Sequence, residues 1–147
     1  MSALPISRQE VVSSARSWLD TPFHHQGRCK GVGVDCIGLV LGVARELALV
    51  PPDFEITGYA RNPDGVSLMA HAERHMQPLP FAQMQAGDVV VLRFDRDPQH
   101  FGVLGDYRHG GLSIIHAAGA VGRVIETRLM FSAAMRFVAA FQLPGVH

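Results

Sequence analysis

The sequence predicts an α+β fold, with helices in the first third of the chain and an antiparallel sheet in the second half. Two apolar segments with helical periodicity precede residue 50, whereas short runs rich in β-branched residues, separated by turns, follow residue 88. Helices followed by strands, without regular alternation of the two, are typical of this class. We expect one domain over residues 1–147, large enough to bury a core without disulfides or metals.

Composition limits the partners that the chain can bind. The formal net charge is zero and the basic residues are scattered, which gives no electrostatic basis for binding nucleic acid or a membrane surface. The N-terminal residues lack the basic and apolar regions of a secretory signal, so we expect cytoplasmic synthesis and two free thiols, Cys29 and Cys36. No apolar run approaches the roughly 18 residues of a membrane span.

The first half of the chain carries two predicted helices. Ser7 and Glu10 form a capping box that begins the first, which Thr21-Pro22 should end. The second begins at Cys36 and is apolar on most sides, so it should be central and buried. Gly38 and Gly42 would let a neighbouring backbone approach it closely. The buried face of the first helix should hold Val11, Val12, Ala15, Trp18 and Leu19.

The second half begins with an irregular crossing over residues 51–65, with a turn at 62–65. A short surface helix is expected over 66–76, ended by Pro78 and Pro80. Strands are then expected at 89–92, 100–104, 112–117, 121–127 and 137–141, with turns at 85–88 and 95–98 and a loop over 106–111.

Cys36 is the candidate nucleophile because it follows a glycine-rich loop and opens an apolar helix. Free N–H groups and the positive end of the helix dipole stabilise a thiolate over a thiol at such a position. We therefore expect rapid alkylation of Cys36 near pH 6. Taken alone, a cysteine in an apolar helix is ordinarily a small core residue.

Two histidines are the candidates for a base and its orienting group. A bulge-free hairpin closed by residues 106–110 would place His100 directly opposite His116, with their Cβ atoms roughly 5 Å apart. One imidazole could then hold the tautomer of the other. Glu126 or His109 could in principle fill the orienting role instead. Pairing of His100 with Cys36 requires that the hairpin pack on the start of the Cys36 helix.

Four segments in this order resemble the NlpC-type cell-wall cysteine peptidases (the NlpC and p-sixty family): TPFHHQGRCKGVGVDCIGLV, QAGDVVVL, QHFGVL and IIHA. The resemblance runs from about Val11 to Pro144, and the ordered set is more specific than any one motif. It implies a papain-like fold in which the catalytic cysteine starts a helix packed on the sheet. More narrowly, the chain resembles the versions encoded in phage tail modules and gene transfer agents, which implies tail proteins as partners and a place in a virion tail.

The resemblance implies Cys36 as nucleophile, His100 as general base and His116 as the orienting group. Asp35 would be a structural or substrate-orienting neighbour, and the N–H of Cys36 an oxyanion donor. The implied substrate is the peptidoglycan stem peptide, cut between D-glutamate, through its γ-carboxyl, and diaminopimelate or lysine, without metal or cofactor. The alternative is a structural tail-assembly protein with this fold and little activity. A third, less favoured option is an acyltransferase or an amidase that acts on another amide.

One position departs from the family pattern. Many members carry a tyrosine ahead of the cysteine, whose hydroxyl lies near the oxyanion site, and Phe23 stands there in this sequence. His24, His25 and Gln26 are the candidates for the missing donor.

Other readings of the same residues involve metal or disulfide chemistry. The spacing of Cys29 and Cys36, with the adjacent histidines, matches no common zinc pattern. A disulfide between the two cysteines would quench the nucleophile. His71 and His75 are four residues apart but lack the H-E-x-x-H order, so a solvated helix face is the favoured interpretation.

Overall fold

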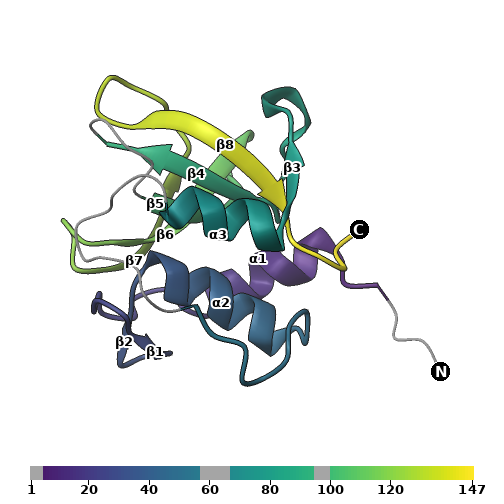
Figure 1. Cartoon of the computed structure of the whole chain (residues 1–147). Helices are drawn as coiled ribbons and strands as arrows, with labels where there is room; N and C mark the ends of the chain where they lie inside the picture. Colours follow the sequence, from purple (N-terminus) through teal and green to yellow (C-terminus); the bar gives the residue numbers. More distant parts are fainter. Residues whose placement is uncertain (1–4, 57–66, 95–99) are drawn as a thin grey trace.

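The computed structural model describes residues 5–56, 67–94 and 100–147. Helices α1 and α2 pack on one face of a six-stranded antiparallel sheet, with α3 beside them (Figure 1). The prediction of an α+β fold with N-terminal helices on an antiparallel sheet is confirmed. The turns expected at 62–65 and 95–98 lie outside the described residues. No helix in the described ranges combines the length and the apolar character of a membrane span.

Helix α1 (Arg8–Arg16) begins with the expected capping box: Ser7 Oγ accepts from the Glu10 N–H at 3.1 Å, and the Glu10 carboxylate accepts from the Ser7 N–H at 2.8 Å. The helix ends at Arg16, earlier than predicted. Trp18 is buried nonetheless, whereas Leu19 is exposed and does not belong to the buried face. The expectation for Leu19 was wrong because the helical spacing does not continue that far.

Helix α2 (Cys36–Glu46) is central and buried along most of its length. Its two glycines are sites of close approach. A Cβ on Gly38 would overlap the carbonyl oxygen of Gly27, and a Cβ on Gly42 would overlap the indole of Trp18. The predicted backbone contact is therefore confirmed at Gly38, while the close neighbour of Gly42 is a side chain.

The sheet has the order β3-β8-β4-β5-β6-β7. The last five strands of the chain match the predicted segments closely, whereas β3 was not anticipated because Pro78 lies within it. A second, two-stranded sheet of β1 and β2, within the loop before α2, was also missed. The bounds are β1 Arg28–Cys29, β2 Gly33–Val34, β3 Gln77–Leu79, β4 Val89–Arg93, β5 His100–Asp106, β6 Leu112–Ala118, β7 Arg123–Arg128 and β8 Arg136–Gln142.

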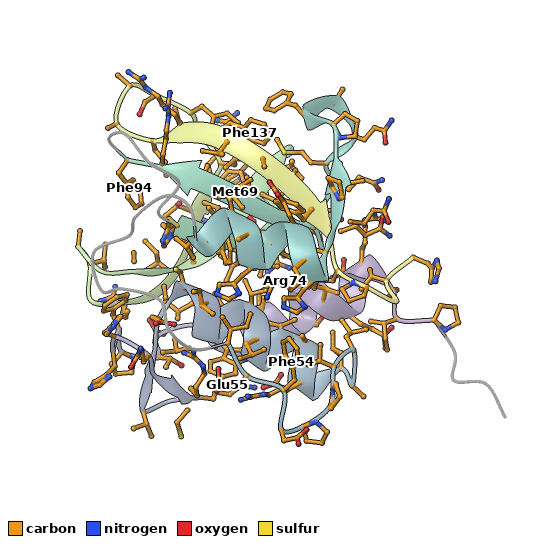
Figure 2. All side chains as sticks on the ribbon, viewed as in Figure 1. Phe54, Glu55, Met69, Arg74, Phe94 and Phe137 are labelled. Atoms are coloured by element: carbon orange, nitrogen blue, oxygen red, sulfur yellow. The ribbon has the colours of Figure 1, made fainter. Side chains whose placement is uncertain are left out.

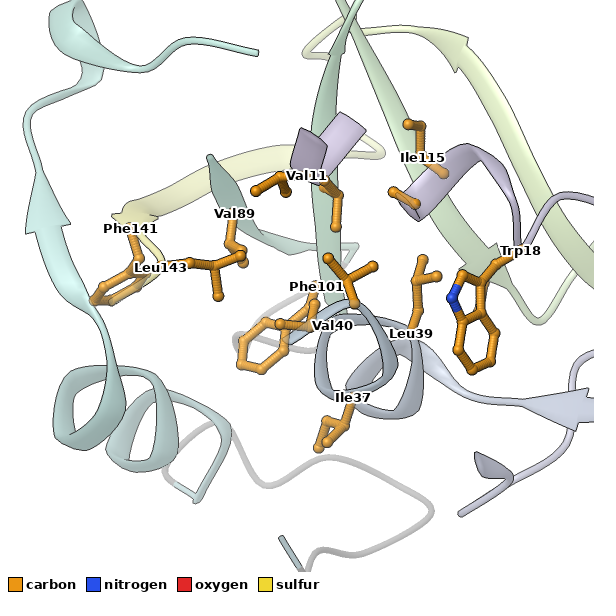
Figure 3. Packing of buried hydrophobic residues seen from close by; sticks show 14 of the residues in the cluster. Val11, Trp18, Ile37, Leu39, Val40, Val89, Phe101, Ile115, Phe141 and Leu143 are labelled. Atoms are coloured by element: carbon orange, nitrogen blue, oxygen red, sulfur yellow. The ribbon is translucent and has the colours of Figure 1, made fainter. Parts of the chain in front are cut away.

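Side-chain alternation divides the buried residues between the two faces of the sheet. The larger cluster lies between the sheet and the helices and includes Val89, Phe101 and Ile115 (Figure 3). A smaller cluster on the other face holds Val90, Leu92, Leu104 and Ile114. Helix α3 (Ser67–His75) contributes Leu68 and Ala72 to the larger cluster, so it is part of the core and not the surface helix that we expected.

The β5–β6 hairpin has a register that differs from the prediction. Asp106 pairs with Leu112, and Val103 with Ile115, so the turn comprises residues 107–111. Gly111 has a φ of 80°, a left-handed conformation that suits a turn and not a strand, so it belongs to the turn and does not pair with Gly105 as the predicted hairpin assumed, while β6 starts at Leu112 as expected. The pairing moves by two positions, so His100 is not directly opposite His116, but both still face the same side of the sheet.

Candidate active site

Cys36 is the first residue of α2, as predicted, and its side chain is half-buried. Asp35 caps the helix: its carboxylate accepts from the Gly38 N–H at 2.8 Å and from the Gln26 N–H at 2.8 Å. The sulfur lies against the start of β5, where the backbone N–H of Phe101 acts on it. The start of α2 therefore meets the strand that carries His100, which is the packing that the prediction required.

The thiol of Cys36 is not in the thiolate-stabilising environment that we expected. Burial raises its pKa to about 11, and the charge of Asp35 acts in the same direction. The N–H groups of Phe101, Ile37 and Cys36 itself favour the thiolate but do not compensate. The helix start acts on the sulfur as predicted, but desolvation is the larger effect, and the expected low pKa is wrong.

His100 and His116 form a buried imidazole pair. His100 Nε2 lies 2.7 Å from His116 Nδ1, and the ring centroids are 4.9 Å apart in an edge-to-face arrangement. The residues are only 5% and 8% exposed, and burial lowers the pKa of His100 to about 3 and that of His116 to about 4. Both rings are therefore neutral in neutral solution.

Gly102 explains how the two histidines meet in the observed register. His116 lies across the hairpin from this glycine and diagonally from His100, a distance that aromatic side chains can span. A Cβ on Gly102 would overlap the side chain of Ile114 and approach the Cβ of His116 to 3.5 Å. The glycine thus leaves the space that the Ile114 side chain occupies next to His116. A glycine two residues after a candidate base, within a strand, was the signal available in the sequence.

Because His100 Nε2 is hydrogen-bonded to His116, His100 Nδ1 is the nitrogen that can accept a proton from the Cys36 thiol. This requires His100 to carry its proton on Nε2 and to donate it to His116 Nδ1. Within the described ranges, no hydrogen bond joins the Cys36 sulfur to the His100 ring. Catalytic hydrogen bonds of this kind are often long in free enzymes and tighten when substrate binds.

The two other candidates for the orienting role lie elsewhere. Glu126 accepts hydrogen bonds from Ser113 Oγ at 2.6 Å and from Arg16 Nη2 at 2.8 Å. His109 is exposed, and its ring contacts Tyr107. Of the three candidates, only His116 is hydrogen-bonded to His100.

The loop before α2 holds the residues expected near an oxyanion site. Phe23 is half-buried and forms a bridge with Val34, and its ring approaches Gly119 in the turn after β6. His24 is exposed, and its Nδ1 donates to the His25 carbonyl at 2.9 Å. The backbone of Gln26 is tied to the helix cap through Asp35, as described above. Roles for Asp35, His24, His25 and Gln26 in substrate binding remain predictions.

Arg28 is a structural residue of this loop that the sequence did not single out. Its Nη1 donates to Asp35 Oδ1 at 3.1 Å and to the Gly27 carbonyl at 2.9 Å, and its Nε donates to Glu55 Oε1 at 3.0 Å. Arg28 therefore connects the loop, the cap of α2 and the segment that follows the helix. In the sequence, only the presence of Asp35 and Glu55 further along the chain pointed to this role.

The remaining candidates are separate from this site. Cys29 is an exposed free thiol, and Cys36 is also unoxidised. His71 and His75 are both half-buried and line an apolar cavity between α2 and α3, so they do not form the solvated face that we expected. Within residues 5–56, 67–94 and 100–147, no three His, Cys, Asp or Glu side chains are grouped as a metal site.

Comparison with solved structures identifies the architecture. The model matches the NlpC/p60 domain of the peptidoglycan hydrolase SagA with a TM-score of 0.65 and 19% identity, over 92% of this chain and 98% of that domain. The chain has the NlpC/P60 papain-like fold. An N-acetylmuramoyl-L-alanine amidase from Bacteroides uniformis matches with a TM-score of 0.61 and 13% identity, over 93% of this chain and 98% of the other.

NlpC1 from Trichomonas vaginalis is similar over 97% of this chain and 46% of its own length, with a TM-score of 0.67 and 14% identity. Neither a family model nor a curated protein matches the sequence. The likeness at these identities concerns the NlpC/P60 fold.

Proposed function

We propose that this NlpC/P60-fold chain is a cysteine peptidase that hydrolyses amide bonds in the stem peptides of peptidoglycan. The observation that carries the proposal is the convergence of Cys36, at a helix start, with the strand that bears a histidine hydrogen-bonded at 2.7 Å to a second histidine. Nucleophile, base and orienting group in this order form the arrangement of a cysteine hydrolase. The similarity to a peptidoglycan hydrolase domain supports the substrate class.

The neutral thiol and imidazole define how the reaction starts. As the Cys36 sulfur attacks the carbonyl carbon, its proton passes to His100 Nδ1, and the carbonyl oxygen takes the negative charge. The N–H groups at the start of α2 stabilise that oxyanion. The C–N bond then breaks, and His100 returns the proton to the departing amine, which leaves a thioester on Cys36.

Hydrolysis of the thioester completes the cycle. Water loses a proton to His100 as its oxygen attacks the thioester carbon, and the sulfur leaves and is protonated again. His116 accepts a hydrogen bond from His100 Nε2 throughout, which stabilises the imidazolium that forms in each step. The bonds and protons of these steps balance without a redox partner or a metal.

We further propose the bond between the γ-carboxyl of D-glutamate and the diamino acid as the site of cleavage. The peptide L-Ala-γ-D-Glu-diaminopimelate and its lysine analogue test this choice by mass spectrometry of the products. The wild type should release the diamino acid, and Cys36→Ala and His100→Ala should release none while they keep the wild-type circular dichroism spectrum. Unchanged turnover in either variant would remove the mechanism.

A structural role is the second candidate, and two observations favour it. Phe23 lacks the hydroxyl that many members of the resembling family place near the oxyanion site, and the Cys36 thiol is neutral. In this case the chain keeps the fold as a tail-assembly protein, and its partners are other tail proteins. A Phe23→Tyr variant separates the two: a peptidase should gain activity when the hydroxyl is restored, whereas a scaffold should stay inactive.

A further inference from the structure

Phe94 is a large aromatic residue that the proposed mechanism does not use. It directly follows β4, and its side chain is 43% exposed. Figure 2 shows Phe94 at the end of β4, whereas the labelled Phe137 belongs to β8.

The register of the sheet places Phe94 beside the proposed base. Leu92 pairs with His100 across β4 and β5, and Phe94 lies two residues beyond Leu92, just past the end of β4. The centroids of the Phe94 and His100 rings are 5.2 Å apart, and their planes are inclined by 41°. Strand pairing and ring contact therefore agree on the position of Phe94.

The His100 and Phe94 rings differ in their exposure to solvent. His100 is buried although it begins its strand, while the phenyl ring that contacts it remains open to solvent. His116 covers another side of His100 with the edge-to-face contact described above. In the part of the chain that the structure describes, Phe94 and His116 are the ring systems in contact with His100.

We propose that Phe94 is a positioning residue whose ring covers the His100 imidazole, fixes the plane of that ring and excludes water from the hydrogen bond to His116. The inference rests on the proposed function for its catalytic meaning, because it acts through the general base. The contact itself does not depend on the substrate.

The groups around His100 determine in which direction the loss of Phe94 would shift the pKa of His100. Within the described residues, the titratable group that acts on His100 is His116 from β6, and the Cys36 thiol lies against the neighbouring Phe101; both groups are neutral in neutral solution. On β4, Leu92 shares its face, and the charged Arg93 alternates to the opposite face. Loss of the phenyl ring would admit water, which stabilises imidazolium and raises the pKa of His100. The attraction of an aromatic face for a cation acts in the opposite direction, and burial is the largest of the causes that lower the pKa of His100.

The test is a pH titration of the histidine ring signals by NMR in the full chain. In Phe94→Ala, the titration midpoints of His100 and His116 should rise by about one pH unit or more toward the ordinary range. Phe94→Leu, which restores an apolar cover, should return them close to the wild-type midpoints. Phe81→Ala is the matched control, because Phe81 is a 53% exposed aromatic that packs with Phe131 and Phe137. It should leave both midpoints unchanged.

Kinetics of stem-peptide cleavage supply a second readout. In Phe94→Ala, the acid limb of the pH profile of kcat/KM should move to higher pH by the same amount as the NMR midpoints. The loss in kcat should be larger than the change in KM. An increase in KM without movement of the acid limb or the midpoints would identify Phe94 as a substrate contact and overturn the proposal. Unchanged midpoints in a folded Phe94→Ala protein would overturn it as well.

The wild-type protein provides a measurement that requires no variant. A nuclear Overhauser effect should connect the ring protons of Phe94 and His100, and its absence would contradict the contact. Inactivity of the wild type on every stem peptide would refute the proposed function, while the NMR results would still decide whether Phe94 covers His100. The two failures are therefore distinguishable.

Discussion

Burial of the His100–His116 pair should make the protein strongly less stable in mild acid. The pKa of His100 is lowered to about 3 and that of His116 to about 4, from an ordinary 6.5 in the unfolded chain. Below pH 6.5 the unfolded chain therefore binds protons that the folded chain excludes. The stability that the neutral pair permits is fully present above this value and is lost as the pH falls from 6.5 to about 4 for His116 and to about 3 for His100.

The size of the effect follows from linkage. Each histidine lowers the free energy of unfolding by about 1.4 kcal/mol per pH unit within this window. Between about pH 7.5 and about pH 5, integration gives about 2 kcal/mol for each residue and about 4 kcal/mol for the pair. A loss of this size is a large fraction of the stability of an ordinary domain.

Urea titrations at the two pH values measure this loss. The single tryptophan, Trp18, is buried and reports unfolding by its fluorescence. His116→Gln should show about half of the wild-type difference between the two pH values, because one titrating group is gone. His109→Gln, at an exposed position, should show the full difference. Equal losses in the wild type and His116→Gln, or a stability that does not change with pH, would refute the reasoning.

Three further predictions concern single positions. With its pKa raised to about 11, Cys36 should react with iodoacetamide much more slowly than exposed Cys29 at neutral pH, as followed by mass spectrometry. An alkylation rate of Cys36 that is already high and independent of pH below pH 7 would contradict the neutral thiol. Gly42→Ala, whose methyl group would overlap Trp18, should destabilise the fold by about 1–3 kcal/mol in urea titrations, and an unchanged midpoint would contradict the packing. Gly102→Ala should separate the imidazole pair and raise the NMR titration midpoints of the histidines, whereas wild-type midpoints would show that the pair does not need this glycine.

The parts of the fold that local sequence determines could be predicted. The capping box at Ser7 depends on neighbouring residues, and the first two helices start where the sequence indicates, although the cap at Asp35 was not predicted. The pairing of β5 with β6 depends on how many residues the turn takes, and both Gly110 and Gly111 adopt positive φ within it, which the sequence does not reveal. The hairpin was therefore recognised, but its register was shifted.

Part of the candidate site could likewise be predicted from the sequence, and part could not. Cys36 and the two histidines could be selected from their motifs, and the same-face relation of the histidines was preserved although the register changed. The protonation state of Cys36 could not be predicted, because it depends on burial by segments that are distant in the sequence. The contact between Phe94 and His100 was missed for the same reason, since only the pairing of β4 with β5 reveals it.

The central claim is that the sulfur of Cys36 forms a covalent intermediate with the carbonyl carbon of a stem peptide. Mass spectrometry of the intact protein, quenched in acid during turnover of such a peptide, tests it directly. The account predicts an acyl adduct that maps to the peptide containing Cys36 and is missing in Cys36→Ala. Turnover without an adduct, or an adduct that persists in Cys36→Ala, would contradict it.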